Sequence, residues 1–273
     1  MSDITKTVLI TGASSGIGKS TAMYFSKKGW NVIATMRSPE KEMELNRIQN
    51  IDCVHLDVTD SDSIKNAIET SLNKYKKIDV IVNNAGYGLT GPFELLTKDQ
   101  IHKQFETNVF GLMEVTKQLL PHFRKEKMGT IVNISSVGGR LTFPLYSLYH
   151  GSKWAVEGFS ESLQFELAPF NIKVKLVEPG PIQTDFYDRS ADKPQVEDKG
   201  VYTTMINSTM NKINKAGLTG LPPEAVAKVI YKAANSKTNK LRYGVGLSIQ
   251  IALFLRKILP DIIFLPIIRQ TLG

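Results

Sequence analysis

The chain has 273 residues, of which 42% are hydrophobic and 22% charged, and its formal net charge is +8. A chain of this length can bury a substantial core in one large α/β domain without disulfides. The single cysteine, Cys53, excludes an internal disulfide, and the scattered lysines argue against nucleic-acid binding.

Short apolar runs alternate with longer helical patterns, which is typical of repeated βαβ units. The expected strands are 7–11, 31–35, 52–56, 80–83, 130–135, 173–178 and 241–245. The expected helices are 16–28, 61–75, 98–125, 147–170 and 222–235. Right-handed crossovers would wind these elements into a single doubly wound Rossmann-type α/β domain, with a seven-stranded parallel sheet and helices on both faces.

Two segments depart from this alternation. Residues 186–221 are polar and contain no clear strand, and a long excursion at this point is often a functional lid. Residues 247–273 are strongly apolar, but Arg256, Lys257, Pro260 and Asp261 interrupt them, so they do not form an uninterrupted spanning helix. We expect residues 1–273 to form one NAD(P)-binding domain that carries this lid and this tail.

The apolar stretches 247–255 and 262–268 of the tail must cover something, because large exposed apolar patches are rare on soluble monomers. The favoured interpretation is that they cover the substrate cleft. A neighbouring subunit and a membrane interface are the alternatives, and Arg256, Lys257 and Arg269 would suit anionic headgroups. The N-terminal residues do not resemble a secretory signal peptide, so we expect a cytoplasmic protein, with membrane association as the alternative.

The segment Thr11-Gly12-Ala13-Ser14-Ser15-Gly16-Ile17-Gly18 follows the first expected strand. Glycines let a backbone turn tightly and approach a phosphate closely, and the N-terminus of the next helix favours an anion. A tight turn alone would also be rich in glycine. The strand–loop–helix context at the start of the chain nevertheless favours a nucleotide-binding site.

The end of the second expected strand indicates which cofactor binds. An acidic residue there would hold the ribose 2′-hydroxyl of NAD, but this chain has Thr35-Met36-Arg37. Arg37 can pair with a 2′-phosphate, which favours NADP(H) over NAD(H), although it can also be an ordinary solvated side chain. Ser14 and Ser15 can add hydroxyl contacts. Asp57 can accept a hydrogen bond from adenine or can stabilise a turn.

Tyr149 and Lys153 are four residues apart in an expected helix, so they lie on one face, one turn from each other. A nearby ammonium stabilises a phenolate, and such a pair suits proton exchange in alcohol–carbonyl chemistry. The pair lies thirteen residues after Ser136 in a chain that opens with a glycine loop. A surface Tyr beside a surface Lys would not explain this combination.

From Thr11 to Thr184 these features resemble the short-chain dehydrogenase/reductase superfamily in their order and spacing. Asn83-Asn84-Ala85-Gly86 is similar to its NNAG motif, and the segment from Pro179 to Thr184 is similar to its nicotinamide loop. The Thr-Met-Arg segment and the apolar tail resemble the hydroxysteroid and retinol dehydrogenase branch. The family's fold and its NAD(P)-dependent oxidoreductase activity are therefore expected.

The resemblance implies a catalytic tetrad of Asn108, Ser136, Tyr149 and Lys153. Tyr149 would be the general acid and base, Ser136 would stabilise charge on the substrate oxygen, and Lys153 would also bind the nicotinamide ribose. Asn108 would hold a water that links Lys153 to solvent, and Ser135 is the less favoured choice for the serine. The expected cofactor-binding residues are Gly12, Ser14, Ser15, Gly16, Ile17, Gly18, Arg37, Asp57, Val58, Asn84, Ala85, Gly86, Tyr149, Lys153, Pro179, Gly180, Ile182 and Thr184. No metal is expected.

The residues expected to face the substrate, besides Ser136, are Phe143, Leu145, Tyr146, Phe186 and Tyr187. They are apolar or aromatic, which favours a small lipophilic alcohol, ketone or aldehyde, although they can equally be ordinary core. His150 would point elsewhere on its helix. In similar proteins the helices near 98–125 and 147–170 pair across a two-fold axis, so we expect a homo-oligomer, either a dimer or a tetramer.

Three alternatives to an NADP(H)-dependent oxidoreductase remain. A catalytically silent NADPH-binding sensor would not need the four tetrad residues. A peripheral membrane binding protein is supported only by the apolar tail. A nucleotide-sugar epimerase would share the Tyr–Lys pair, but its usual glycine loop has a different spacing.

Overall fold

The computed structural model describes residues 5–184, 191–192 and 200–272. The strands are β1 Thr7–Ile10, β2 Asn31–Met36, β3 Ile51–His55, β4 Val80–Asn83, β5 Gly88–Leu89, β6 Gly129–Ile134, β7 Ile172–Glu178, β8 Ala191–Asp192 and β9 Arg242–Gly244. The α-helices are α1 Gly16–Lys27, α2 Ser61–Tyr75, α3 Lys98–Phe105, α4 Gly111–Glu126, α5 Ser147–Leu167, α6 Thr203–Leu218, α7 Pro223–Ala234, α8 Leu247–Ile258 and α9 Asp261–Leu272. Short helical turns are η1 Pro39–Lys41, η2 Leu45–Arg47, η3 Phe93–Leu95, the π-helical η4 Glu106–Phe110, η5 Val137–Gly139 and η6 Ala168–Phe170.

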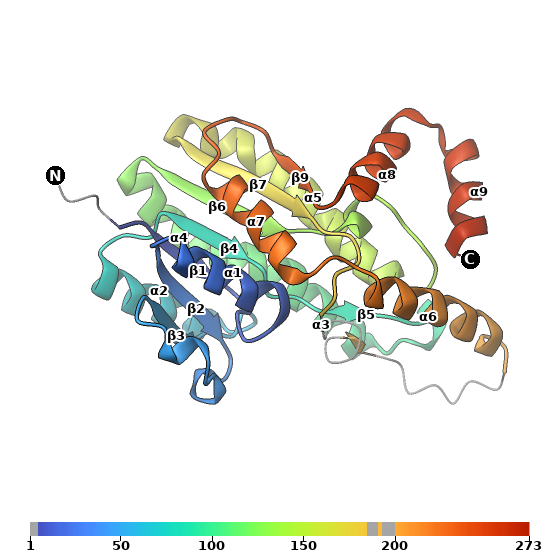
Figure 1. Cartoon of the computed structure of the whole chain (residues 1–273), viewed down its shortest axis with the longest axis horizontal. Coiled ribbons are helices and arrows are strands. Elements are labelled where there is room, and N and C mark those ends of the chain that lie inside the picture. Colours follow the sequence, from blue (N-terminus) through green and yellow to red (C-terminus); the bar gives the residue numbers. More distant parts are fainter. Residues whose placement is uncertain (1–4, 185–190, 193–199, 273) are drawn as a thin grey trace.

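Seven strands form one parallel sheet in the order β3-β2-β1-β4-β6-β7-β9 (Figure 1). The chain winds outward from β1 in one direction and from β4 in the other, so the order reverses between these two strands. Ligands of open α/β sheets bind at the carboxyl ends of the strands beside such a reversal. The predicted doubly wound seven-stranded fold is confirmed.

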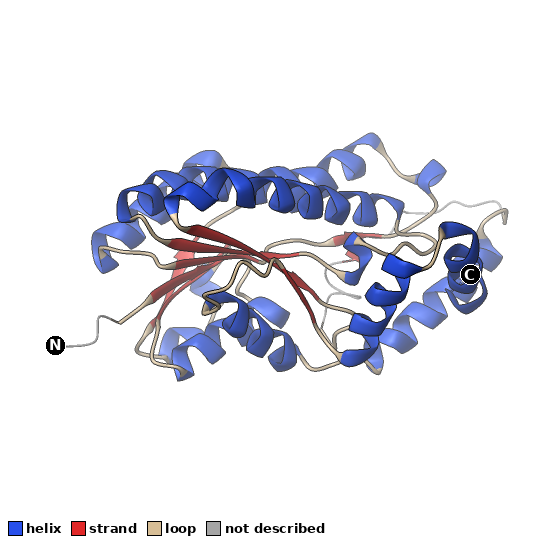
Figure 2. Ribbon diagram, turned by 90° about the horizontal axis from the view of Figure 1, so that it is seen from above, coloured by secondary structure: helices blue, strands red, loops and turns tan. Residues whose placement is uncertain are grey.

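Helices cover both faces of the sheet (Figure 2). Successive residues of a strand point to opposite faces, so Val8 and Ile10 of β1 pack against α1 and α7, whereas Leu9 packs against α2, α4 and α5. Both faces are therefore apolar, as parallel strands buried on two sides require. Side chains such as Phe25 of α1 and Phe123 of α4 are fully buried between the layers.

The helix predicted over 98–125 is divided by the π-helical turn η4. Thr97 begins α3 with a capping box in which its hydroxyl accepts from the backbone N–H of Gln100. Asn108 lies within η4, and π-helical turns frequently occur at functional sites. A π-helical turn contains one residue more than an α-helical turn, and the apolar periodicity of the sequence did not predict it.

Two regions show more regular structure than the sequence pattern predicted. Residues 203–218 of the polar excursion form α6, and Ala191–Asp192 pairs with β5 in a small second sheet. The apolar tail forms α8 and α9, which lie at the end of the molecule opposite the N-terminus (Figures 1 and 2). Within the described residues, no helix combines the length and the apolar character needed to cross a membrane.

Candidate active site

The loop between β1 and α1 turns through left-handed backbone at Gly12 and Gly16, whose φ angles are +66° and +52°. A Cβ atom at Gly12 would lie 2.9 Å from the Cα of Ala85. A Cβ atom at Gly16 would lie 3.3 Å from the Thr184 side chain. Side chains at these positions would therefore clash with the neighbouring loop and narrow the opening beside Thr184.

Hydrogen bonds hold this loop against the segment that follows β4. The Thr11 hydroxyl accepts from the backbone N–H groups of Asn84 and Ala85, each at 3.0 Å. The Asn84 amide donates to the carbonyl oxygens of Thr11 at 2.9 Å and Gly12 at 3.0 Å. Gly18 lies behind the loop rather than along the cleft, because its Cβ atom would lie 2.2 Å from the Gly12 oxygen. The glycine loop is thus held in place by the Thr11 and Asn84 side chains and by close backbone packing at Gly18.

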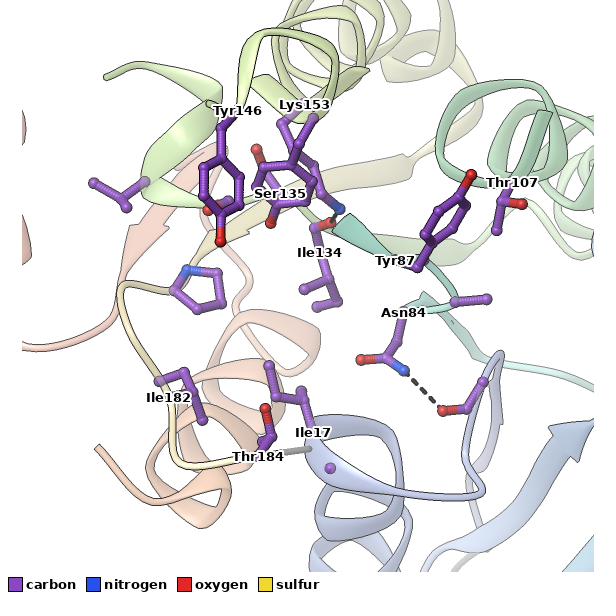
Figure 3. A pocket seen from close by; sticks show the side chains of 18 of the residues that line it. Ile17, Asn84, Tyr87, Thr107, Ile134, Ser135, Tyr146, Lys153, Ile182 and Thr184 are labelled. Carbon is purple, nitrogen blue, oxygen red and sulfur yellow. Dashed lines mark hydrogen bonds between the residues drawn. The ribbon is translucent and has the colours of Figure 1, made fainter. Parts of the chain in front are cut away.

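A cleft of about 940 Å³ opens at the carboxyl ends of the strands. Figure 3 shows Tyr146 and Lys153 on one side of it, facing Ile17, Ile182 and Thr184 on the other. The predicted site residues that line it are Gly12, Ser14, Ser15, Gly16, Ile17, Arg37, Asp57, Val58, Asn84, Ala85, Gly86, Ser136, Phe143, Tyr146, Tyr149, Lys153, Pro179, Gly180, Ile182 and Thr184. Gly18, Asn108 and Leu145 do not line it, and Phe186 and Tyr187 lie outside the described residues.

Arg37 is exposed and follows β2 directly at the cleft wall. The nearby carboxylate of Glu42 is buried, and it accepts from Lys19 at 2.9 Å and from two backbone N–H groups of its own loop. Glu42 is not part of the cleft lining. Arg37 therefore borders this end of the cleft, and Asp57 is the only carboxylate among the described lining residues.

Asp57 stabilises a turn and also borders the cleft. Its carboxylate accepts from the backbone N–H of Thr59 at 3.0 Å and from the Thr59 hydroxyl at 2.8 Å, which closes a turn ahead of α2. The same residue also lines the cleft. The turn orients the carboxylate, so its contact with a ligand would add to the structural role rather than replace it.

Tyr149 and Lys153 lie on the face of α5 that borders the cleft, and both are buried. The Lys153 Nζ lies 5.8 Å from the centroid of the Tyr149 ring and donates to the carbonyl oxygen of Ile134 at 2.9 Å. Burial lowers the pKa of Lys153 to about 8, and the negative charge of Glu157 acts in the opposite direction. Lys153 can therefore carry its charge near neutral pH while remaining sensitive to its neighbours.

Ser136 and Ser135 differ in their surroundings because successive residues of an extended segment point to opposite sides. The Ser136 hydroxyl accepts from the backbone N–H of Gly138 at 3.0 Å, which leaves its proton available for donation. The Ser135 hydroxyl lies on the side of Gly139 and Glu157, since a Cβ atom at Gly139 would touch both residues. Both serines border the cleft, and this placement favours Ser136 as the serine that faces a ligand there.

Asn108 lies beneath the cleft rather than along it. Its carbonyl oxygen accepts from the backbone N–H of Tyr87 at 3.0 Å, and its amide donates to the Tyr87 oxygen at 2.9 Å and to the Ser152 hydroxyl at 3.2 Å. A Cβ atom at Gly86 would lie 3.1 Å from the Asn108 oxygen and 3.8 Å from the Lys153 Nζ. Asn108 thus ties the η4 turn to the strand loop and to α5 directly below Lys153.

The cleft becomes apolar beyond Tyr149. Tyr146 and Tyr149 are buried against Ile213 of α6, with Ile206 and Met210 packed beside them. The Leu145 backbone has a positive φ of 67°, and its oxygen accepts from the Gly91 N–H at 2.8 Å, which holds this loop against its neighbour. His150 is also buried, but its ring stacks on Tyr146 behind the cleft.

The sequence pattern placed the 186–221 excursion and the tail at the cleft, but it did not single out the residues of α6, α8 and α9 that line it. Thr209, Lys212 and Ile213 line the cleft from α6, and Ile249, Ala252 and Ile268 line it from α8 and α9. The spacing of Thr209 and Ile213 is that of one helix face, and this was the available signal. Ile249 lies so close to the nicotinamide-loop segment that a Cβ atom at Gly180 would be 2.5 Å from its side chain.

One elongated cleft therefore joins a glycine loop, a lysine–tyrosine pair, a serine hydroxyl and an apolar pocket. The glycine cradle can hold a pyrophosphate, and the Tyr149 hydroxyl can exchange a proton with a substrate oxygen that Ser136 also contacts. This arrangement suits alcohol–carbonyl interconversion beside a dinucleotide.

The family model for short chain dehydrogenases matches residues 6–195. A 3-ketodihydrosphingosine reductase of Bacteroides thetaiotaomicron is 37% identical over 244 residues, which cover 89% of each chain. A short-chain dehydrogenase structure from Streptomyces avermitilis superposes with a TM-score of 0.84 at 35% identity, covering 93% of this chain and 92% of the other. The structure of ElxO with NADP bound gives a TM-score of 0.73 at 32% identity, covering 88% and 97%. The chain belongs to the short-chain dehydrogenase/reductase family of oxidoreductases.

Proposed function

We propose that this protein is an NADP(H)-dependent oxidoreductase that interconverts a lipophilic alcohol with its ketone or aldehyde. The observation that carries the proposal is the position of Tyr149, Lys153 and Ser136 at the junction of the glycine-loop end and the apolar end of one cleft. A silent NADPH-binding sensor would not need these three side chains together. The intact set therefore favours catalysis over binding alone.

Glycine-loop residues and the segment from Pro179 to Thr184 would hold the cofactor, since both line the cleft and meet where Gly16 approaches Thr184. The glycine loop fits a dinucleotide, because Gly12 and Gly16 leave open the space that any side chain at these positions would occupy. When bound, the cofactor supplies or accepts the hydride. Arg37 supports NADP(H), because it borders the cleft while the buried carboxylate of Glu42 is bonded to Lys19.

Tyr149 would give its hydroxyl proton to the substrate oxygen during reduction and take it back during oxidation. Ser136 would donate a hydrogen bond to the same oxygen and stabilise its developing charge. Lys153 would stabilise the phenolate form of Tyr149, since its ammonium is held near the ring by Ile134. Asn108 would hold the η4 turn and α5 in register beneath this pair.

The substrate is proposed to be lipophilic because apolar side chains surround the end of the cleft beyond Tyr149. Phe143 and Tyr146 line this end together with Ile213 from α6. Residues 186–221 would act as the substrate lid of a single domain that spans residues 1–273. A relative named 3-ketodihydrosphingosine reductase acts, by its name, on 3-ketodihydrosphingosine, which supports a ketone as the proposed substrate.

We also propose that the tail both covers the cleft and contacts a lipid surface in the cytoplasm. Its inner side chains Leu253 and Phe264 are buried against Val137 and Leu141. Its outer side chains remain open, with Leu247 73% and Ile262 83% exposed. The exposed charges of the tail are Lys257, Arg269 and Asp261, and Asp261 is paired with Arg256, so the unpaired charges in the described tail are positive and suit an anionic membrane surface.

A homo-oligomer is proposed from exposed aromatic residues on the central helices. Phe110 is 53% exposed at the end of η4, and Trp154 is 46% and Phe165 71% exposed on α5. Aromatic side chains are enriched at protein interfaces. Light scattering at micromolar protein concentration tests this proposal, and a single monomeric mass would contradict it.

The activity itself is tested by measuring NADPH oxidation with a panel of lipophilic ketones and aldehydes. The expected result is turnover of at least one of them, with NADPH used more efficiently than NADH. Tight NADPH binding with no turnover of any compound in either direction would favour the silent sensor instead.

A further inference from the structure

The face of α5 that carries Tyr149 and Lys153 continues with two carboxylates. Glu157 and Glu161 follow at the same four-residue spacing, so the four side chains form one stripe along the helix. Tyr149 and Lys153 border the cleft, whereas Glu157 lies one turn further from it. The mechanism above uses only the first two members of the stripe.

Glu157 is almost completely buried, with 5% of its surface exposed. One carboxylate oxygen accepts from the Arg242 Nε of the edge strand β9 at 2.9 Å. The other oxygen has no hydrogen bond of good geometry, although the Ser135 hydroxyl lies near enough to act on the pKa of the carboxyl. A carboxylate so buried is retained at a cost in free energy, because desolvation offsets much of the ion-pair attraction.

The groups that surround Glu157 come from each neighbouring element. Glu178 ends β7 and is 2% exposed, with a carboxylate oxygen 3.6 Å from Arg140 and 3.8 Å from Arg242. Arg242 also pairs with Glu161 at 2.5 Å. From η5, Gly139 approaches so closely that a Cβ atom would lie 3.0 Å from the Glu157 Cγ and 2.6 Å from the Ser135 hydroxyl oxygen.

The hydrogen bonds indicate which of the two buried carboxylates keeps its charge. Glu157 has a direct hydrogen bond from Arg242, whereas both arginine contacts of Glu178 are longer than a hydrogen bond. Burial and the neighbouring Glu157 raise the pKa of Glu178 to about 7. Burial also raises the pKa of Glu157, but the hydrogen bond and the charge of Arg242 act in the opposite direction, so the better-paired Glu157 carries the negative charge of the cluster, one turn from Lys153.

We propose that Glu157 is a positioning residue that keeps Lys153 in its ammonium form, and that Arg242 holds Glu157 in place from the sheet edge. Lys153 is buried and makes its hydrogen bond to the neutral carbonyl of Ile134, so Glu157 supplies the nearby negative charge. The proposal rests on the proposed roles of Lys153 and Tyr149, but the charge state of Lys153 can be measured without any turnover.

The first test follows acetylation of Lys153 by acetic anhydride across a pH series in the protein without added cofactor, with peptide mass spectrometry as the readout. Only the neutral amine reacts, so the pH midpoint reports the lysine pKa. Glu157→Gln should move the midpoint down by about one pH unit, the usual effect of losing one nearby opposite charge. Glu161→Gln is the matched control, because it also removes an Arg242 contact but leaves the buried cluster intact.

Glu157→Met is a second neutral variant of similar length, so the test continues if the Gln variant does not fold. Glu157→Asp keeps the charge and should restore the wild-type midpoint to within about half a pH unit. A wild-type midpoint in a folded neutral variant would overturn the proposal. A shift in Glu157→Asp as large as that of the neutral variants would also overturn it, since loss of packing would then be the cause.

The second readout is the pH profile of kcat for NADPH-driven reduction. Glu157→Gln lowers the pKa at which Lys153 loses its ammonium charge, so the alkaline limb should move to lower pH in this variant and stay in place in Glu161→Gln. Absence of turnover in the wild type would contradict the proposed function and leave the acetylation result to decide the role of Glu157. An unshifted limb in an active Glu157→Gln enzyme would contradict the positioning role.

Discussion

The Lys153 ammonium lies 5.8 Å from the centroid of the Tyr149 ring and is held there by a 2.9 Å hydrogen bond to the carbonyl oxygen of Ile134. The hydrogen bond anchors the lysine to β6, the strand that leads into Ser136. The positions of the lysine, the tyrosine and the serine are therefore coupled through one backbone atom. Movement of β6 relative to α5 would disturb all three.

Substitution of Tyr149 by Phe should lower kcat by about 10²–10⁴-fold, which is the usual contribution of a positioned proton donor. The ring packs against Tyr146 and Ile213, and Phe preserves this packing, so the fold and NADPH affinity should be retained. Steady-state kinetics on any accepted carbonyl, with NADPH fluorescence titration as the control, checks this. Turnover close to the wild type would refute the role of Tyr149.

Substitution of Arg37 by Leu should weaken NADPH binding by about ten-fold or more and leave NADH binding nearly unchanged. The reason is the loss of a charge-assisted contact worth roughly 1.5–3 kcal/mol. Arg37 is exposed, so the variant should fold as well as the wild type. Titration of both cofactors against both proteins decides the matter. Equal affinity of the wild type for NADH and NADPH would defeat the proposed cofactor preference.

Substitution of Gly18 by Ala should damage the cofactor loop although Gly18 does not line the cleft. The new Cβ atom would lie 2.2 Å from the Gly12 oxygen and 2.6 Å from the Asn84 amide nitrogen, and backbone cannot yield as a flexible side chain can. Gly158 is a suitable control, because a Cβ atom there meets nothing within 4 Å. We expect Gly18→Ala, and not Gly158→Ala, to lose most of its NADPH affinity in a binding titration. Equal affinity in the two variants would contradict this account.

Removal of the tail after Gly246 should lower both stability and activity in the absence of lipid. Ile249 packs against Gly180, and Leu253 and Phe264 are buried against Val137 and Leu141, so the truncation would expose an apolar wall of the cleft. Thermal melts and turnover measurements check this effect.

The variant Phe254→Glu tests whether the tail binds lipid independently of its role in covering the cleft. It alters an outer side chain that is 60% exposed. This variant should keep its activity and lose sedimentation with anionic liposomes, while neutral liposomes should bind neither protein strongly. If wild type and variant sediment equally, lipid contact through this face is wrong. A change in oligomeric mass in the variant would instead indicate a subunit interface.

The free energy of unfolding should fall as the pH drops from about 6.5 to about 4, in part because of His150. Burial lowers the pKa of His150 to about 4 in the folded protein, whereas an unfolded histidine titrates near 6.5. Below pH 6.5 the unfolded chain therefore binds a proton that the folded chain does not, which contributes a loss of about 3 kcal/mol. His150→Leu should remove this part of the pH dependence. Urea unfolding at several pH values checks it, and parallel curves for the two proteins would contradict it.

Local spacing made the catalytic helix and the nucleotide loop predictable. Tyr149 and Lys153 share a face because any α-helix brings residues four apart together. The predicted helix from Ser61 to Tyr75 agrees with the structure to the residue, and Asp60 caps it through hydrogen bonds to Asp62 and Ser63. The amphipathic α6 and the division of the helix at η4 were missed, because a polar helix and an extra residue in a turn barely alter the apolar pattern.

The sequence by itself determined the order of strands and helices, the glycine loop and the register of Tyr149 and Lys153, because each depends on backbone geometry over a few neighbouring residues. The tertiary structure decided which distant residues meet. Examples are Arg242 with Glu157, Ile249 with Gly180, and Asn108 with both Tyr87 and Ser152. Such contacts depend on how strands and helices pack across the sheet. Many pairings of similar apolar surfaces are compatible with the same local sequence pattern, so only the folded chain selects among them.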